Sequence, residues 1–234
     1  MTIDIFVNEL EKSGIIITDS QLQKLEKYFV ILREKNKIMN LTKIIEKTDV
    51  YLKHFYDSLT IVKILNLNKN IKLCDIGSGA GFPGIVLKIM FPELNITLID
   101  SLNKRVKFLN YVIEELDLDK IKAIHCRAEE YAKSNIELYD VVTARAVAKT
   151  NILLELSMPM LKVNGTFIAM KAKIDEEIQE IDSTCKKLNC KLEKIETFKL
   201  PIEESIRNLI SFRKISSTDK KYPRKFEQIK KNPL

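Results

Sequence analysis

Apolar positions in the first seventy residues recur every three or four residues, which is the spacing of amphipathic helices. Thr18 supplies an N-cap for the first such run. The run consists of Leu22, Leu25, Tyr28, Phe29 and Leu32. The pattern predicts one helix that ends near residues 36–40 and a second over about residues 49–65. Residues 1–69 are therefore expected to form a small helical N-terminal region.

From residue 71 the pattern changes to short apolar runs, typical of buried strands, that alternate with helical spacing. The predicted strands are residues 71–76, 95–100, 121–126, 139–146 and 165–170. Helices are expected between them, starting after residue 84 and over residues 103–116, 151–161 and 175–188. Such alternation predicts an α/β fold with a mostly parallel sheet covered by helices on both faces. Two further strands, 191–200 and 205–214, would pair antiparallel at its edge, so that a seven-stranded sheet occupies a domain over residues 70–214.

The first predicted strand runs directly into a glycine-rich loop. Four glycines, Gly77, Gly79, Gly81 and Gly84, occur within eight positions between this strand and the next helix. Glycines at such a junction allow positive φ and a close approach of the backbone to a ligand, with helix N–H groups facing it. The loop therefore predicts a cofactor site.

Two acidic residues narrow the choice of cofactor. Asp100 ends the second strand about twenty residues after Gly81, as expected of a carboxylate that binds both ribose hydroxyls. Asp75 precedes the first glycine, where a carboxylate is unfavourable beside the pyrophosphate of a dinucleotide. A ligand that carries positive charge fits better, and S-adenosylmethionine has an ammonium and a sulfonium.

The remaining candidate residues lie at the ends of other predicted strands and on the second helix. Ligands of parallel sheets bind outside the carboxyl ends of the strands, where Ala128, Glu129 and Arg145 are placed together with Gly77 and Asp100. On the helix, His54, Asp57 and Ser58 have the i, i+3, i+4 spacing of one face. These polar side chains are expected to contact the cofactor or substrate; the alternative is that Asp57 and Ser58 are surface residues and His54 is a partly buried neutral ring.

Most of the formal net charge of +7 lies in residues 213–234, where eight basic and two acidic residues leave a local balance of +6, and the C-terminal tail, residues 215–234, contains Lys221, Arg224 and Lys225. A basic tail attracts polyanions such as RNA without reading their sequence, although it could also serve only solubility. The sequence has no apolar run that could span a membrane and no export leader, so a cytoplasmic location is expected. With no C-x-x-C pair and two distant histidines, no metal site is expected.

Several motifs together resemble the bacterial small-subunit ribosomal RNA guanine-N7 methyltransferases, also called the glucose-inhibited division protein B family. The resemblance covers nearly the whole chain in order. The segments that carry it are residues 40–42 (NLT), 54–59 (HFYDSL), 75–84 (DIGSGAGFPG), 100–105 (DSLNKR), 127–129 (RAE), 142–148 (VTARAVA) and 221–225 (KYPRK). The Gly-Phe-Pro extension of the loop and the Thr-Ala-Arg-Ala segment are the most specific of them.

The resemblance implies a Rossmann-like class I fold and methyl transfer from S-adenosylmethionine to N7 of a guanine in 16S rRNA. It identifies Gly77, Phe82, Ala128, Glu129 and Arg145 as cofactor contacts, beside Gly79 and Asp100. Arg145 would hydrogen-bond the cofactor carboxylate or guanine O6 near the methyl group. His54 and Ser58 are weaker candidates for RNA or methionine contact, and Lys221, Arg224 and Lys225 for RNA phosphates. The partner is 16S rRNA or the small subunit, and no stable protein partner is predicted.

Three alternatives stay open on the sequence. One is a methyltransferase that acts on protein or a small molecule, which the basic tail disfavours. A dinucleotide-dependent oxidoreductase is disfavoured by the glycine spacing. A non-catalytic RNA-binding or ribosome-assembly protein would need no intact cofactor residues.

Overall fold

The computed structural model describes residues 1–145, 148–174 and 181–234, and its centre is a seven-stranded sheet with the order β3-β2-β1-β4-β5-β7-β6. Strands β1 to β5 are parallel, whereas β7 is antiparallel to both β5 and β6. Their bounds are β1 Lys72–Ile76, β2 Asn95–Asp100, β3 Ile121–His125, β4 Tyr139–Arg145, β5 Leu161–Lys171, β6 Cys190–Lys199 and β7 Ile206–Lys214. The predicted α/β class, the parallel core and the antiparallel edge are confirmed.

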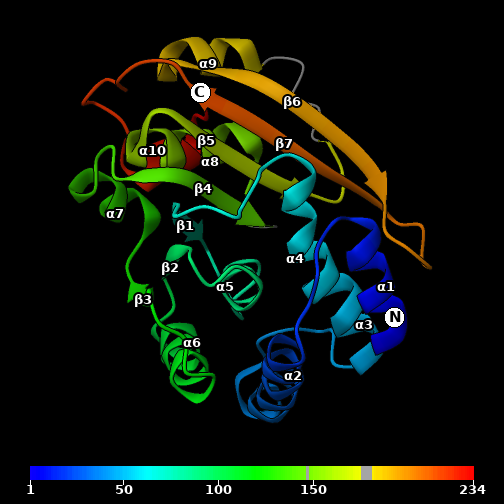
Figure 1. The fold of residues 1–234 in the computed structure, drawn as a ribbon. Coiled ribbons are helices and arrows are strands. Elements are labelled where there is room, and N and C mark those ends of the chain that lie inside the picture. The colour runs from blue at the N-terminus through cyan, green and yellow to red at the C-terminus, as the bar shows by residue number, and fades with distance from the viewer. Residues whose placement is uncertain (146–147, 175–180) are drawn as a thin grey trace.

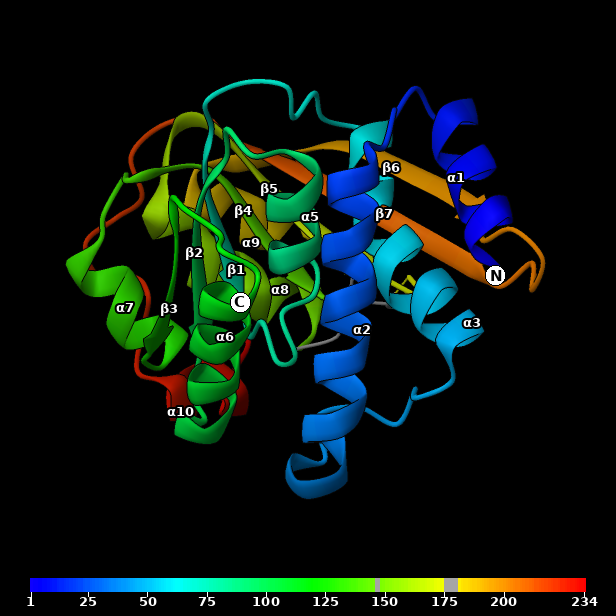
Figure 2. The ribbon, with the colours of Figure 1, turned by 60° about the horizontal axis from the view of Figure 1, so that its bottom comes forward.

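Helices cover both faces of the sheet (Figures 1 and 2). One face carries α5 (Gly84–Met90), α6 (Asn103–Glu115) and the N-terminal helices, and the other carries α7 (Ala128–Ser134), α8 (Thr150–Ser157) and α9 (Ile181–Leu188). Each face has its own apolar cluster, with Leu98 central in the first and Phe167 in the second. Residues 175–180, the first part of the predicted helix 175–188, lie outside the described residues.

The N-terminal region begins with α1 (Ile3–Lys12) and the long α2 (Asp19–Met39). As predicted, Thr18 caps α2, and Gln21 completes a capping box with it. Tyr28 and Phe29 of α2 belong to the same apolar cluster as the sheet. The region therefore packs directly on the sheet and shares a core with it, while the division at residue 69 stays a prediction.

The predicted helix over residues 49–65 is interrupted, which corrects the sequence analysis. It consists of α3 (Lys47–Val50), a π-helical turn η1 (Tyr51–Tyr56), α4 (Asp57–Leu59) and a 3₁₀ turn η2 (Thr60–Lys63). A π turn adds a residue per turn and rotates the following side chains. This rotation is associated here with the burial of His54, Asp57 and Ser58, which are 8%, 6% and 0% exposed.

The C-terminal tail folds against the sheet domain. It includes α10 (Phe226–Lys231), whose Ile229 is fully buried in the second apolar cluster. Another 3₁₀ turn, η3 (Met158–Met160), joins α8 to β5. None of the helices within the described ranges is long and apolar enough to span a lipid bilayer.

Candidate functional site

The glycine loop lies between the end of β1 and the start of α5, as predicted. Gly77 and Gly79 have φ values of 68° and 59°, in the left-handed region that favours glycine. The N–H groups of Gly77 and Ser78 bond to the carbonyl of Ile99 on β2, at 2.8 and 3.1 Å. The loop is thereby attached to the adjacent strand and opens at the carboxyl edge of the sheet.

Asp100 organises this loop from the end of β2. Its Oδ2 accepts a hydrogen bond from the Gly79 N–H at 2.9 Å, and its Oδ1 accepts one from the Leu102 N–H at 2.9 Å. The guanidinium of Arg105 lies 3.4 Å from Oδ2. Because each carboxylate oxygen can accept more than one hydrogen bond, Asp100 can still receive hydroxyl groups.

A cavity of about 400 Å³ opens in front of the loop. It brings together predicted residues from three strand ends and from η1, and it adds Thr42 and Arg105. The predicted residues that line it are Gly77, Gly79, Phe82, Asp100, His54 and Arg145. Residues far apart in the sequence thus share one site.

Aromatic and cationic side chains form one side of this cavity. The His54 ring stacks on Phe82 with a centroid distance of 4.3 Å and an interplanar angle of 18°. The Arg145 guanidinium lies 5.2 Å from the centroid of Phe82. Burial and the nearby charge of Arg145 lower the pKa of His54 to about 3, so the imidazole is neutral at physiological pH.

Arg145 is held in place by the interrupted helix. Its Nη1 donates to the Lys53 carbonyl and to Asp57 Oδ2, each at 3.1 Å, and its Nη2 lies 3.3 Å from His54 Nδ1. The other Asp57 oxygen, Oδ1, accepts from Arg207 Nε of β7 at 3.2 Å. Helical spacing groups Asp57 with His54 but does not reveal Arg207, because no local pattern links residues 150 positions apart.

Ser58 does not reach the cavity. It is fully buried, and its hydroxyl donates to the carbonyl of His54 at 2.5 Å. The hydroxyl is thus bonded to the helix backbone, and the contact of Ser58 with RNA or methionine stays a prediction.

Asp75 has a different role from the one inferred for it. The carboxylate is fully buried and does not line the cavity. Its Oδ2 accepts a hydrogen bond from the Gly84 N–H of α5 at 3.1 Å. Its Oδ1 has no hydrogen-bond partner among the described residues. Burial raises the pKa of Asp75 to about 6, despite opposing contributions from the Gly84 N–H, Ser78 and Arg145. The acid before the glycines therefore supports the start of α5 rather than facing a cationic ligand.

This raised pKa predicts a pH dependence of stability. The folded protein holds the Asp75 proton to a higher pH than the unfolded chain, so this contribution favours folding at low pH and is lost as pH rises through about 6. Relative to Asp75→Asn, the free energy of unfolding of the native protein should fall by about 2–3 kcal/mol between pH 4 and pH 7.5. Urea unfolding of the native protein and of Asp75→Asn between pH 4 and pH 7.5 measures this change. If the difference between their free energies of unfolding did not vary with pH, the prediction would be contradicted.

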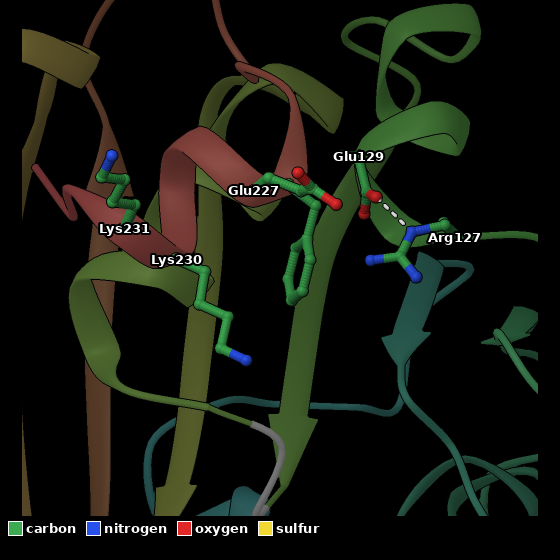
Figure 3. A pocket seen from close by; sticks show the side chains of 6 residues that line it. Arg127, Glu129, Glu227, Lys230 and Lys231 are labelled. Atoms are coloured by element: carbon green, nitrogen blue, oxygen red, sulfur yellow. Dashed lines mark hydrogen bonds and ion pairs between the residues drawn. The ribbon is translucent and has the colours of Figure 1, made fainter.

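Ala128 and Glu129, at the start of α7, do not line the glycine-loop cavity. Glu129 instead borders a separate cavity of about 750 Å³ with Arg127 and residues of α10 (Figure 3). There Arg127 pairs with Glu129, and its guanidinium lies 4.5 Å from the Phe226 ring centroid. In Figure 3 Lys230 extends from α10 toward this hollow. The predicted cofactor contact of Ala128 and Glu129 stays a prediction.

The three tail residues predicted to bind RNA differ in their surroundings. Arg224 donates to both oxygens of fully buried Glu155 on α8, at 2.8 and 2.6 Å. Lys221 forms an exposed ion pair with Asp219, and Lys225 is exposed before α10. The geometry therefore gives Arg224 a part in docking the tail, and it leaves Lys221 and Lys225 at the surface. No group of three or more His, Cys, Asp or Glu side chains in the described ranges could hold a metal ion.

Comparisons with known proteins give consistent results. The family model described as rRNA small subunit methyltransferase G matches residues 21–210. Proteins called ribosomal RNA small subunit methyltransferase G from Bacillus licheniformis and Bacillus velezensis are 47% and 46% identical over 237 residues, covering 100% of this chain and 99% of each relative. The counterpart from Staphylococcus carnosus is 44% identical over 238 residues, with the same coverage.

Solved structures share the fold at low identity. A SAM-dependent methyltransferase from Aquifex aeolicus has a TM-score of 0.56 and 13% identity over 75% of this chain and 97% of its own. TYW2 of M. jannaschii, solved in complex with AdoMet, has a TM-score of 0.52 and 19% identity over 63% of this chain and 71% of its own. These likenesses show the methyltransferase fold.

Proposed function

Because this chain belongs to the rRNA small subunit methyltransferase G family, we propose that it transfers a methyl group from S-adenosylmethionine to N7 of a guanine in 16S rRNA. The observation that supports this site most strongly is the cavity shared by Gly77, Gly79, Asp100 and Arg145 at the carboxyl edge of the sheet. Ligands of doubly wound sheets bind at this edge, between the two neighbouring strands whose connections run to opposite sides of the sheet. In this sheet those two strands are β1 and β4.

The residues of the cavity fit the cofactor. A Cβ atom on Gly79 would come no closer than 3.8 Å to another protein atom, so a side chain there would occupy cavity space instead of packing against protein. Asp100 would accept the ribose hydroxyls, the glycine backbone would border the methionine portion, and Phe82 would pack against the ligand. Ala128 and Glu129 would border the adenine. When bound, S-adenosylmethionine supplies an electrophilic methyl group on its sulfonium.

The protein needs no general base for this reaction. Guanine N7 carries a lone pair and is already a hydrogen-bond acceptor, so its attack on a methyl group removes no proton beforehand. His54, which is neutral and packed on Phe82, suits a positioning role. Catalysis would come from orientation of the reacting groups, with Arg145 directed at the cofactor carboxylate or guanine O6.

Exposed positive charge would hold the RNA. Lys221 and Lys225 of the tail, together with Lys104 and Lys107 of α6, would contact phosphates, and binding should weaken steeply with salt. Arg105 of α6, which is partly buried beside Asp100, would add positive charge at the edge of the cofactor cavity. Base recognition would use the shape of the RNA and an accessible guanine. A ribosomal RNA substrate also places the enzyme in the cytoplasm as part of this proposal.

The decisive experiment measures methyl transfer from labelled S-adenosylmethionine to small-subunit RNA from a strain that lacks this protein. The labelled nucleoside is then identified by mass spectrometry. Label in 7-methylguanosine is expected. If the cofactor binds but no RNA nucleoside is labelled, the proposal fails, and a protein or small-molecule substrate becomes the one to test.

Asp100→Asn should weaken S-adenosylmethionine binding by about 10- to 100-fold. The amide removes the negative charge and turns an N–H group toward the backbone N–H of either Gly79 or Leu102, so one of these hydrogen bonds is lost. The loss of a hydrogen bond to a charged group costs roughly 1.5–3 kcal/mol. Titration calorimetry measures the dissociation constant. Asp140→Asn is a matched control. Asp140 lies near the start of β4, at the edge of the sheet away from the cavity, and it also accepts a hydrogen bond from a backbone N–H, that of Lys72. Equal affinities of both variants would refute the assigned role.

A further inference from the structure

A second cavity adjoins the glycine-loop cavity. It has a volume of about 260 Å³ and lies where β4 and β5 end and β7 begins. Both cavities are lined by His54 and Arg145, so they meet at these two side chains. Met170 and Leu209 add apolar surface to the second cavity, whereas Arg207 and Lys171 add charge.

Among the described residues that line this second cavity, basic side chains outnumber acidic ones. Asp57 is its one acidic lining residue among the described residues, and a guanidinium occupies each of its oxygens, Arg145 at 3.1 Å and Arg207 at 3.2 Å. Lys53 also lines the cavity, but its ammonium pairs with Glu203 at 2.9 Å. One carboxylate therefore faces two arginines, and the site favours a ligand with hydrogen-bond acceptors or negative charge.

Arg207 is rigidly placed and still has donors to offer. Its Nε donates to Asp57, and its Nη1 donates to the Ser205 hydroxyl at 3.3 Å and to the Ile206 carbonyl at 2.9 Å. No acceptor in the described ranges bonds to Nη2. The side chain is 19% exposed and lines only the second of the two cavities.

We propose that the second cavity receives the target base of the RNA and that Arg207 recognises guanine O6. This inference rests on the proposed function. Guanine carries O6 and N7 side by side on one edge, so a base whose N7 faces the cofactor cavity presents O6 to a donor nearby. Met170 and Leu209 would contact the base face, as expected for a nucleotide taken out of its stack. Arg207 is then a specificity-determining residue outside the cofactor site.

The test compares Arg207→Gln with Arg213→Gln under single-turnover conditions. Arg213 is a matched control because it lies at the opposite end of β7, where it pairs with Glu193. Arg207→Gln should lower kcat/KM for RNA by about 10- to 100-fold, as for one lost base contact, while the dissociation constant of S-adenosylmethionine changes less than twofold. Arg213→Gln should match the native protein in both measurements.

A substrate analogue identifies the atom that is recognised. RNA with 2-aminopurine at the methylated position keeps N7 but lacks O6. The native enzyme should lose at least about tenfold in kcat/KM on this RNA, whereas Arg207→Gln should methylate it as fast as its guanine counterpart. Arg207→Lys, which keeps a cation beside Asp57 but loses the planar fork, should show an intermediate loss and replaces the glutamine variant if that one does not fold.

Two results would overturn the inference. An equal 2-aminopurine penalty in native and variant enzymes would exclude O6 as the partner of Arg207. A loss of cofactor affinity as large as the loss on RNA would show that Arg207 acts only by holding Asp57 and Arg145. Failure of the proposed function is distinguishable from both, because the native enzyme itself would then label no guanine.

Discussion

Replacement of Arg145 by alanine is expected to lower kcat/KM for methyl transfer by at least about 100-fold, the scale seen when a preorganised donor at a reacting centre is removed. The guanidinium contacts Asp57, the Lys53 carbonyl, His54 and the face of Phe82, and it lines both cavities. Its loss removes a cationic donor that both cavities share. It also leaves Asp57, which is 6% exposed, with one cationic partner fewer.

Single-turnover transfer from labelled S-adenosylmethionine measures this effect, and circular dichroism confirms that the variant is folded. Arg145→Lys keeps the charge but not the planar fork, so it should retain part of the activity. If Arg145→Ala transfers methyl groups within threefold of the native rate, Arg145 has no catalytic part.

Gly84→Ala should destabilise the fold by about 1–3 kcal/mol, as overpacked cores do. A Cβ atom at this position would lie 2.2 Å from Leu98 Cδ2 and 2.9 Å from Asp75 Oδ2. Both side chains are fully buried, so neither can move into solvent. Helix α5 must therefore shift away from β1 and β2, which strains the bond between the Gly84 N–H and Asp75.

Urea unfolding of Gly84→Ala gives the change in the free energy of unfolding. Gly14→Ala measures the cost of a positive φ without a clash, because Gly14 has a φ of 75° and a Cβ there would meet nothing within 4 Å. Gly84 has no positive φ, so its cost comes from the clash. Cofactor affinity should also fall in Gly84→Ala, since α5 follows the glycine loop. Stability equal to that of the native protein would mean that the contact between α5 and the sheet is looser than its geometry implies.

Local patterns were sufficient to predict the site at the edge of the sheet. Strand periodicity, the glycines after Asp75 and the spacing to Asp100 are features of short segments, and parallel strands must bring their carboxyl ends together. Gly77, Gly79, Asp100 and Arg145 accordingly meet in one cavity. Resemblance to the family added Phe82, which lines the same cavity.

Local patterns did not predict the surroundings of Asp75 and Ser58, which were considered by charge and by helical spacing. Spacing predicts which side chains share a face, but it does not reveal what packs against that face. Asp75 lies under α5, and Ser58, which follows the π turn over Tyr51–Tyr56, is fully buried. Neither position could be read from spacing, because burial is a property of the assembled layers.

The amino-acid sequence alone determined the order of the seven strands, the helices α2, α5, α6, α8 and α9, the glycine loop and the carboxylate that organises it, because each depends on residues close together in the chain. It did not predict α1, α7 and α10. Only the tertiary structure decided that Asp57 pairs with Arg145 and Arg207, from segments 88 and 150 residues away. It likewise decided that Arg224 binds Glu155. Buried charges take whichever partners the fold brings within reach, and contact across such separations leaves no periodic signal in a single sequence.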